Sequence, residues 1–67
     1  MTEQKSLTIS GLLRSKQAAV YLGISAWKLR QLVNTGRLAV VQYEDGAPWL
    51  FRPADLDAYI SANLRVL

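Results

Sequence analysis

The 67-residue chain has no cysteine and no histidine. The first absence excludes disulfides, thiolate zinc sites and cysteine nucleophiles, and the second removes the usual neutral-pH base and the commonest metal ligand. The sequence also lacks a secretory leader pattern and any apolar run near the roughly 20 residues that cross a bilayer. We therefore predict a single soluble, cytoplasmic domain that is not an enzyme, uses no cofactor or metal and has no membrane partner.

Acidic residues are scarce in the first part of the chain. Residues 1–43 carry six basic residues against the single acid Glu3, whereas residues 44–67 carry two basic and four acidic residues. The total formal charge of +3 hides this asymmetry. A basic half of this kind is what a surface for a polyanion needs.

Helix start and stop signals divide the middle of the chain into two short helices. Ser15 is a candidate N-cap for the first and Gly23 a candidate stop. Ser25 and Gly36 have the same roles for the second, which covers residues 26–35. Two helices joined by a tight turn that contains glycine match the helix-turn-helix pattern, although an ordinary helical hairpin has the same outline.

The second helix has one apolar side and one polar side. At about 100° per residue, its buried stripe consists of Leu29, Leu32 and Val33. The opposite side contains no acid and consists of Trp27, Lys28, Arg30, Gln31 and Asn34. This side favours contact with a nucleic acid, and a solvated helix face is the alternative.

A hairpin and a third helix follow. Residues 38–43 and 49–51 are rich in β-branched and aromatic residues, and the Asp45-Gly46 pair between them is a strong hairpin-turn signal. A two-residue turn puts Trp49 and Phe51 on the face that packs on the helices, whereas a longer loop would change the register. Pro53 fits a first helical position, which predicts a helix from there to about Leu64.

The apolar side of this third helix consists of Leu56, Tyr59, Ile60 and Leu64. The order of elements predicts a mainly α fold with a small β-hairpin, a winged helix-turn-helix with a two-stranded wing and a C-terminal helix. We place this domain at residues 12–67, with a flexible N-terminal arm over residues 1–11. The leucines at the junction, Leu12 and Leu13, are expected to dock on the core.

Three motifs carry a family resemblance: Ala18-Ala19-Val20-Tyr21-Leu22-Gly23-Ile24-Ser25, Gly36-Arg37-Leu38 and Asp55-Leu56-Asp57-Ala58-Tyr59. From Leu12 to Tyr59 the chain resembles the excisionase-type branch of the MerR-like winged helix-turn-helix proteins. The resemblance implies a bacterial or phage-encoded, nucleoid-associated protein that binds double-stranded DNA. It also implies an integrase, or further copies of the chain on adjacent DNA sites, as partners.

The same resemblance suggests an excisionase, a recombination directionality factor that binds adjacent sites and bends DNA for integrase-mediated excision. A small transcriptional regulator of the AlpA or MerR-like type is the alternative within the family. An alternative of another class is an antirepressor-like protein-interaction module on the same fold, which would use Trp27 and the acidic wing.

Candidate DNA contacts follow from these elements. The residues placed for base contact lie at the start of the second helix: Ala26, Trp27, Lys28, Arg30 and Gln31. Lysine and arginine can pair with guanine, and Gln31 can pair with adenine. Three further cations are candidates for the DNA backbone: Arg14, Lys16 and Arg37.

The wing departs from the family pattern, because acids stand at its tip where the family usually has basic residues. Glu44 and Asp45 would repel a phosphate. We therefore expect Tyr43 or Arg52, rather than the tip itself, to make any contact between this region and DNA.

Overall fold

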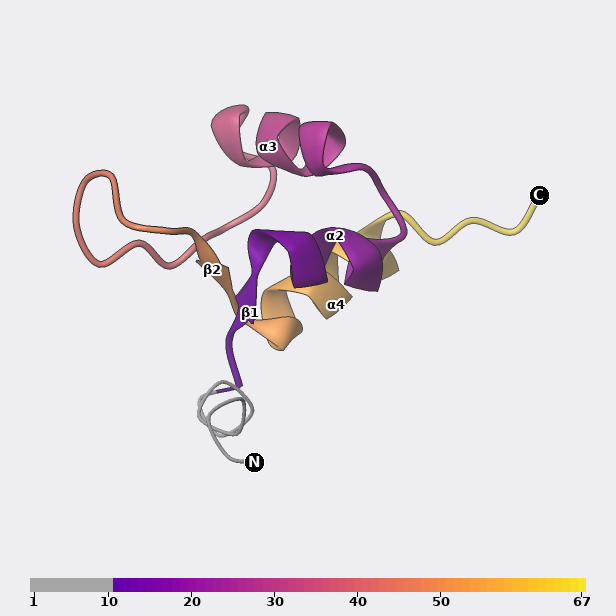
Figure 1. Ribbon diagram of the computed structural model, residues 1–67. Coiled ribbons are helices and arrows are strands. Elements are labelled where there is room, and N and C mark those ends of the chain that lie inside the picture. The colour runs from indigo at the N-terminus through magenta and orange to yellow at the C-terminus, as the bar shows by residue number, and fades with distance from the viewer. Residues whose placement is uncertain (1–10) are drawn as a thin grey trace.

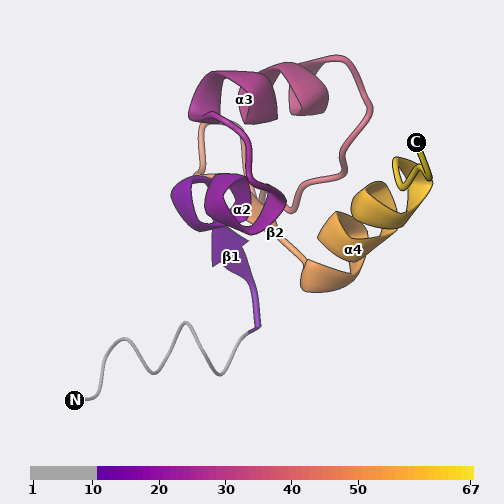
Figure 2. The same cartoon turned by 90° about the vertical axis from the view of Figure 1, so that its right-hand side faces the viewer.

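The computed structural model describes residues 11–67. Its helices are α2 (Ser15–Leu22), α3 (Ala26–Asn34) and α4 (Pro53–Ala62), and its strands are β1 (Leu13–Arg14) and β2 (Leu50–Phe51). Helix α2 lies between α3 and α4, and the wing between α3 and β2 projects away from the helices (Figure 1, Figure 2). The predicted mainly helical, winged helix-turn-helix fold is confirmed. Apart from Gly11, the predicted arm lies outside the described residues.

Both helices of the helix-turn-helix end where glycine allows a left-handed backbone. Gly23 has a φ of 72° and Gly36 a φ of 77°. In each case the amide after the glycine donates to the carbonyl five residues earlier, at 3.0 Å after α2 and 2.8 Å after α3. At the start of α3, the Ser25 hydroxyl accepts from the amide of Lys28 at 3.0 Å. The stop signals and the Ser25 cap are therefore confirmed.

The predicted cap of α2 is wrong by one residue. Arg14, rather than Ser15, is the N-cap, because Arg14 has an extended backbone with ψ of 168° and Ser15 is the first residue of the helix. The Arg14 amide donates to the Gln17 side-chain oxygen at 3.0 Å. This bond is one half of a capping box and satisfies a donor that the helix itself leaves free.

Strand β2 is paired on both of its edges. It runs antiparallel to β1, with Leu13 opposite Phe51. On the other side Leu50 exchanges two backbone hydrogen bonds with Val41, at 2.8 and 2.9 Å. Val41 lies opposite Leu50, so residues 45 and 46 lie at the centre of the turn, and the amide of residue 47 donates to the carbonyl of residue 44 at 2.9 Å. In a two-residue hairpin the doubly hydrogen-bonded pairs would be 44–47 and 42–49 instead of 41–50, so the loop is the longer alternative.

The wing is much shorter than the predicted hairpin, because its ladder is reduced to the Val41–Leu50 bridge. The next hydrogen-bonded pair toward the turn would join residues 43 and 48. Pro48 has no N–H, so that pair cannot exchange two hydrogen bonds. Gly46 has a φ of 84°, whereas Asp45 is not among the positive-φ residues. The turn is thus not of type I′, the type whose twist matches that of the flanking strands.

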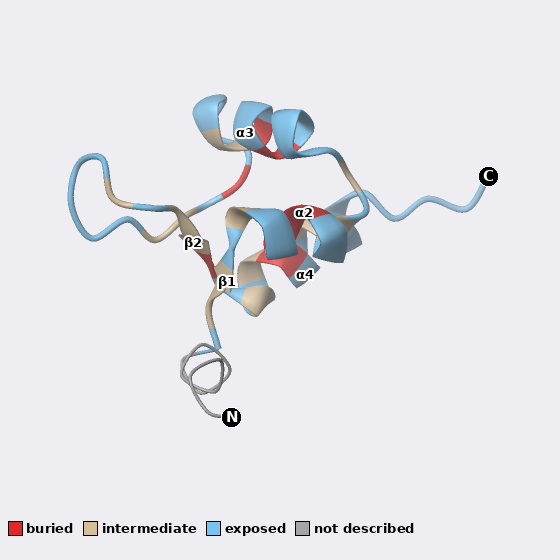
Figure 3. Ribbon diagram, in the orientation of Figure 1, coloured by how far each residue is buried: buried red, intermediate tan, exposed pale blue. Residues whose placement is uncertain are grey.

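The core lies where α2, α3, β2 and α4 meet (Figure 3). Its buried residues are Ala18, Ala19, Leu29, Leu32, Leu38, Phe51 and Leu56. Trp49 is half-buried and packs against this cluster, as does Leu13 from β1. The predicted inward face of Trp49 and Phe51 and the docking of Leu13 are confirmed.

The third helix buries less than its sequence pattern predicts. It ends at Ala62 instead of Leu64, and Leu56 and Tyr59 are its contributions to the core cluster. Ile60 is exposed, and the Leu64 side chain is 78% exposed. The reason is that α2, the helix on which α4 packs, is only eight residues long, so the end of α4 has little apolar surface to cover.

A hydrogen bond joins α2 to α4 at the surface. The Tyr21 hydroxyl donates to a carboxylate oxygen of Asp57 at 2.5 Å. This bond raises the pKa of Tyr21 above its ordinary value of 10.0, because the phenolate could not donate it. The bond therefore stabilises the fold below pH 10, and its contribution is lost as the pH rises through the raised pKa of Tyr21.

Replacing Asp57 with asparagine should return the pKa of Tyr21 toward 10.0, since the carboxylate that accepts the bond is removed. The measurement is a spectrophotometric titration of phenolate absorbance in the wild type and in Asp57→Asn. A Tyr21→Phe variant identifies the titration step that belongs to this residue. Identical titration curves for the wild type and Asp57→Asn would contradict the prediction.

Candidate nucleic-acid interface

Helix α3 turns one side to the core and the other to solvent. Leu29 and Leu32 are buried, whereas Trp27 on the opposite side is 65% exposed. At about 100° per residue, Trp27, Gln31 and Asn34 form the outer ridge of the helix. All three ridge residues are exposed, and none is acidic. The ridge is therefore accessible to a binding partner.

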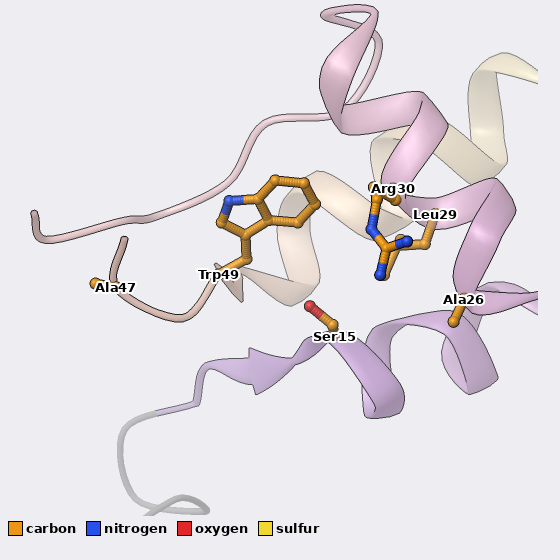
Figure 4. Close-up of a pocket in the computed structure, with 6 residues that line it drawn as sticks. All are labelled: Ser15, Ala26, Leu29, Arg30, Ala47 and Trp49. Atoms are coloured by element: carbon orange, nitrogen blue, oxygen red, sulfur yellow. The ribbon is translucent and has the colours of Figure 1, made fainter. Parts of the chain in front are cut away.

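A cation stands on each flank of this ridge, and each lines a separate hollow. Arg30 lines a hollow of about 270 Å³ between the starts of α2 and α3 and the wing (Figure 4). Lys28 lines a hollow of about 160 Å³ on the other flank, together with Gln31 and Arg37. The exposed side of α3 thus carries one aromatic side chain and two amides, with Lys28 on one flank and Arg30 on the other.

The two acids of α4 are hydrogen-bonded to other side chains. Both carboxylate oxygens of Asp55 accept from Arg52, each at 2.7 Å. The bond from Arg52 lowers the pKa of Asp55 below its ordinary 3.8, and it raises that of Arg52. Asp57 accepts from the Tyr21 hydroxyl. Within residues 11–67, the cations of α2 and α3 have no carboxylate partner, and their positive charge is available to an anion.

All ten predicted contact residues are exposed: Arg14, Lys16, Ala26, Trp27, Lys28, Arg30, Gln31, Arg37, Tyr43 and Arg52. The structure brings Ala26 and Arg30 into one hollow, and Lys28, Gln31 and Arg37 into the other. Tyr43 lies in the wing and is 75% exposed. Arg52 caps α4 and is held by an acid, which leaves its guanidinium less available than the sequence suggests.

Several residues that line the two hollows were not predicted as site residues, among them Ser15, Trp49 and Thr35. Ser15 and Trp49 line the hollow of Arg30, and Thr35 lines that of Lys28. Ser15 and Trp49 come from segments far from α3 in sequence, so no local pattern could have joined them. Thr35 was predicted only as the end of the helix, where its hydroxyl donates to the Gln31 carbonyl at 2.8 Å.

None of the helices within residues 11–67 has the length and apolar character that crossing a membrane requires. The described residues also contain no cluster of metal-binding side chains. A family model described as a helix-turn-helix domain matches residues 12–64. No curated protein and no solved structure matches the chain significantly.

Proposed function

Because this chain belongs to the helix-turn-helix domain family, whose domains bind DNA and are typically not enzymes, we propose that it is a sequence-specific regulator of double-stranded DNA. Helix α3 enters the major groove with its N-terminal half toward the bases. Phosphates on both sides of the groove are held by the cations that flank the helix.

The observation that carries this proposal is the acid-free outer side of α3. A helix with its side chains is about 10–12 Å across, and the major groove of B-DNA is about 12 Å wide. The ridge of Trp27 and Gln31 then faces base edges, while Lys28 and Arg30 lie near the groove walls. An amide such as that of Gln31 can make two hydrogen bonds to adenine.

The test begins with selection of a preferred duplex from a random pool by the full chain. Affinity should fall linearly with salt on logarithmic axes, with a slope of about −0.9 per phosphate contact. Gln31→Ala should lower affinity for the selected duplex by roughly tenfold and for a scrambled duplex much less, because a base contact carries sequence information.

Asn63→Ala is the matched control, since it removes an exposed amide at the C-cap of α4, where the side chain donates to the Tyr59 carbonyl at 2.9 Å. It should bind both duplexes as the wild type does. Binding that is insensitive to salt, or an equal loss on both duplexes in Gln31→Ala, would count against groove reading by α3.

For the biological role we propose an excisionase that assists an integrase on adjacent sites. The support is the resemblance of residues 12–59 to excisionase-type proteins. A plasmid excision assay with the cognate integrase tests it, with DNA bending measured on the selected site. A change in transcription without excision would instead assign the regulator role, and binding to a repressor without DNA binding the protein-interaction role.

A further inference from the structure

The hollow beside Arg30 is small and is formed by separate segments of the chain. Its volume of about 270 Å³ lies below the roughly 300–1,000 Å³ of pockets for drug-sized ligands. Its walls come from three separate parts of the chain: Ser15 of α2, Ala26, Leu29 and Arg30 of α3, and Ala47 and Trp49 of the wing. A hollow of this size at the edge of α3 is large enough for a single repeating unit of a polymeric ligand.

The lining of the hollow favours an anionic unit with an apolar part. Figure 4 shows the Arg30 guanidinium directed into the space between α3 and Ser15, with the Trp49 indole across from it. No carboxylate lines the hollow, and within residues 11–67 neither the guanidinium nor the Ser15 hydroxyl has a hydrogen-bond partner. The indole supplies a flat apolar wall beside these two polar groups.

We propose that this hollow holds a sugar–phosphate unit of one DNA strand, with the phosphate on Arg30 and Ser15 and the deoxyribose against Trp49. The assignment rests on the proposed DNA-binding function. It replaces the guanine contact that the sequence suggested for Arg30, and it gives the backbone contact of this residue a defined site with Ser15 and Trp49. Sequence reading then belongs to the ridge residues of α3.

The experiment uses the selected duplex with a methylphosphonate placed at one position at a time, which removes the charge of a single phosphate. The wild type should lose about tenfold in affinity at one or two positions, because a charge-assisted hydrogen bond is lost. Arg30→Ala should lose the same affinity on unmodified DNA, equally on selected and scrambled duplexes. It should then be insensitive at those positions, and Arg30→Lys should remain sensitive.

A second variant tests occupation of the hollow without touching a charge. Ala47→Leu adds volume at the wing wall and should weaken binding to every duplex by about tenfold, with circular dichroism unchanged. Arg65→Ala, which removes a cation after the end of α4, should keep the wild-type pattern of methylphosphonate sensitivity.

Two results would overturn the assignment. The first is an Arg30→Ala variant that keeps the full methylphosphonate pattern or loses affinity at one base pair alone, and the second is unchanged binding by Ala47→Leu. Failure of the proposed function looks different, since the wild type itself would then show no salt-dependent binding to the selected duplex.

Discussion

Replacing Phe51 with alanine removes roughly a third or more of the free energy of unfolding of the domain. Phe51 is fully buried, and truncating a buried phenylalanine costs about 3–5 kcal/mol. The total stability of a domain of this length is only roughly 3–10 kcal/mol. The loss is severe because Phe51 belongs both to the core cluster and to the strand that pairs with β1. Thermal and urea unfolding followed by circular dichroism measure it.

Tyr43→Ala is the control for this prediction. It also truncates an aromatic side chain of the wing region, but that side chain is 75% exposed. Surface truncations of this kind change stability by about 0.5 kcal/mol or less. If Phe51→Ala melted within a few degrees of Tyr43→Ala, Phe51 would not have the central place in the core described above.

Reversing the charge of Lys28 lowers DNA affinity by about 100-fold at low salt. The change removes a charge-assisted contact and places a carboxylate next to the DNA backbone. It should leave α3 intact, because residue 28 is the third helical position after the Ser25 cap and glutamate is favoured there. Titration of the selected duplex at several salt concentrations measures the effect, which should shrink as salt rises.

Arg65→Glu is the matched control, because it changes the net charge of the chain by the same amount after the end of α4. Its affinity for DNA should stay within about threefold of wild type, since screening weakens the effect of distant exposed charges. Equal losses in Lys28→Glu and Arg65→Glu would mean that overall charge, rather than the face of α3, determines binding.

The helices could be predicted because their limits are set by nearby residues. Ser25 caps α3 through an amide three residues away, and Gly23 and Gly36 end their helices through bonds that span five residues. The pairing of β1 with β2 had no such local signal. It joins two-residue strands from distant parts of the chain, and hydrophobic alternation cannot be read in a segment as short as Leu13–Arg14.

The candidate interface was predictable to the same extent as α3 itself. Helical periodicity placed Trp27, Lys28 and Gln31 on one exposed side, and they are exposed. The same periodicity gave no reason to join Ser15 or Trp49 to Arg30, since that hollow exists only once the segment before β2 has brought Trp49 beside the starts of α2 and α3. Spatial neighbours contributed by separate segments are what single-sequence patterns omit.

The β1–β2 pairing also determines how cooperatively the domain unfolds. The helices have only eight, nine and ten residues, and isolated helices shorter than about 12–15 residues are marginal in water. Leu13 and Phe51 lie on either side of α2 and α3 in the chain, and their pairing holds the two ends of this segment together. We therefore expect α3 to be lost once that pairing is broken. Amide hydrogen exchange should then proceed through global unfolding throughout α2 and α3, and DNA bound to α3 should slow exchange across the whole domain.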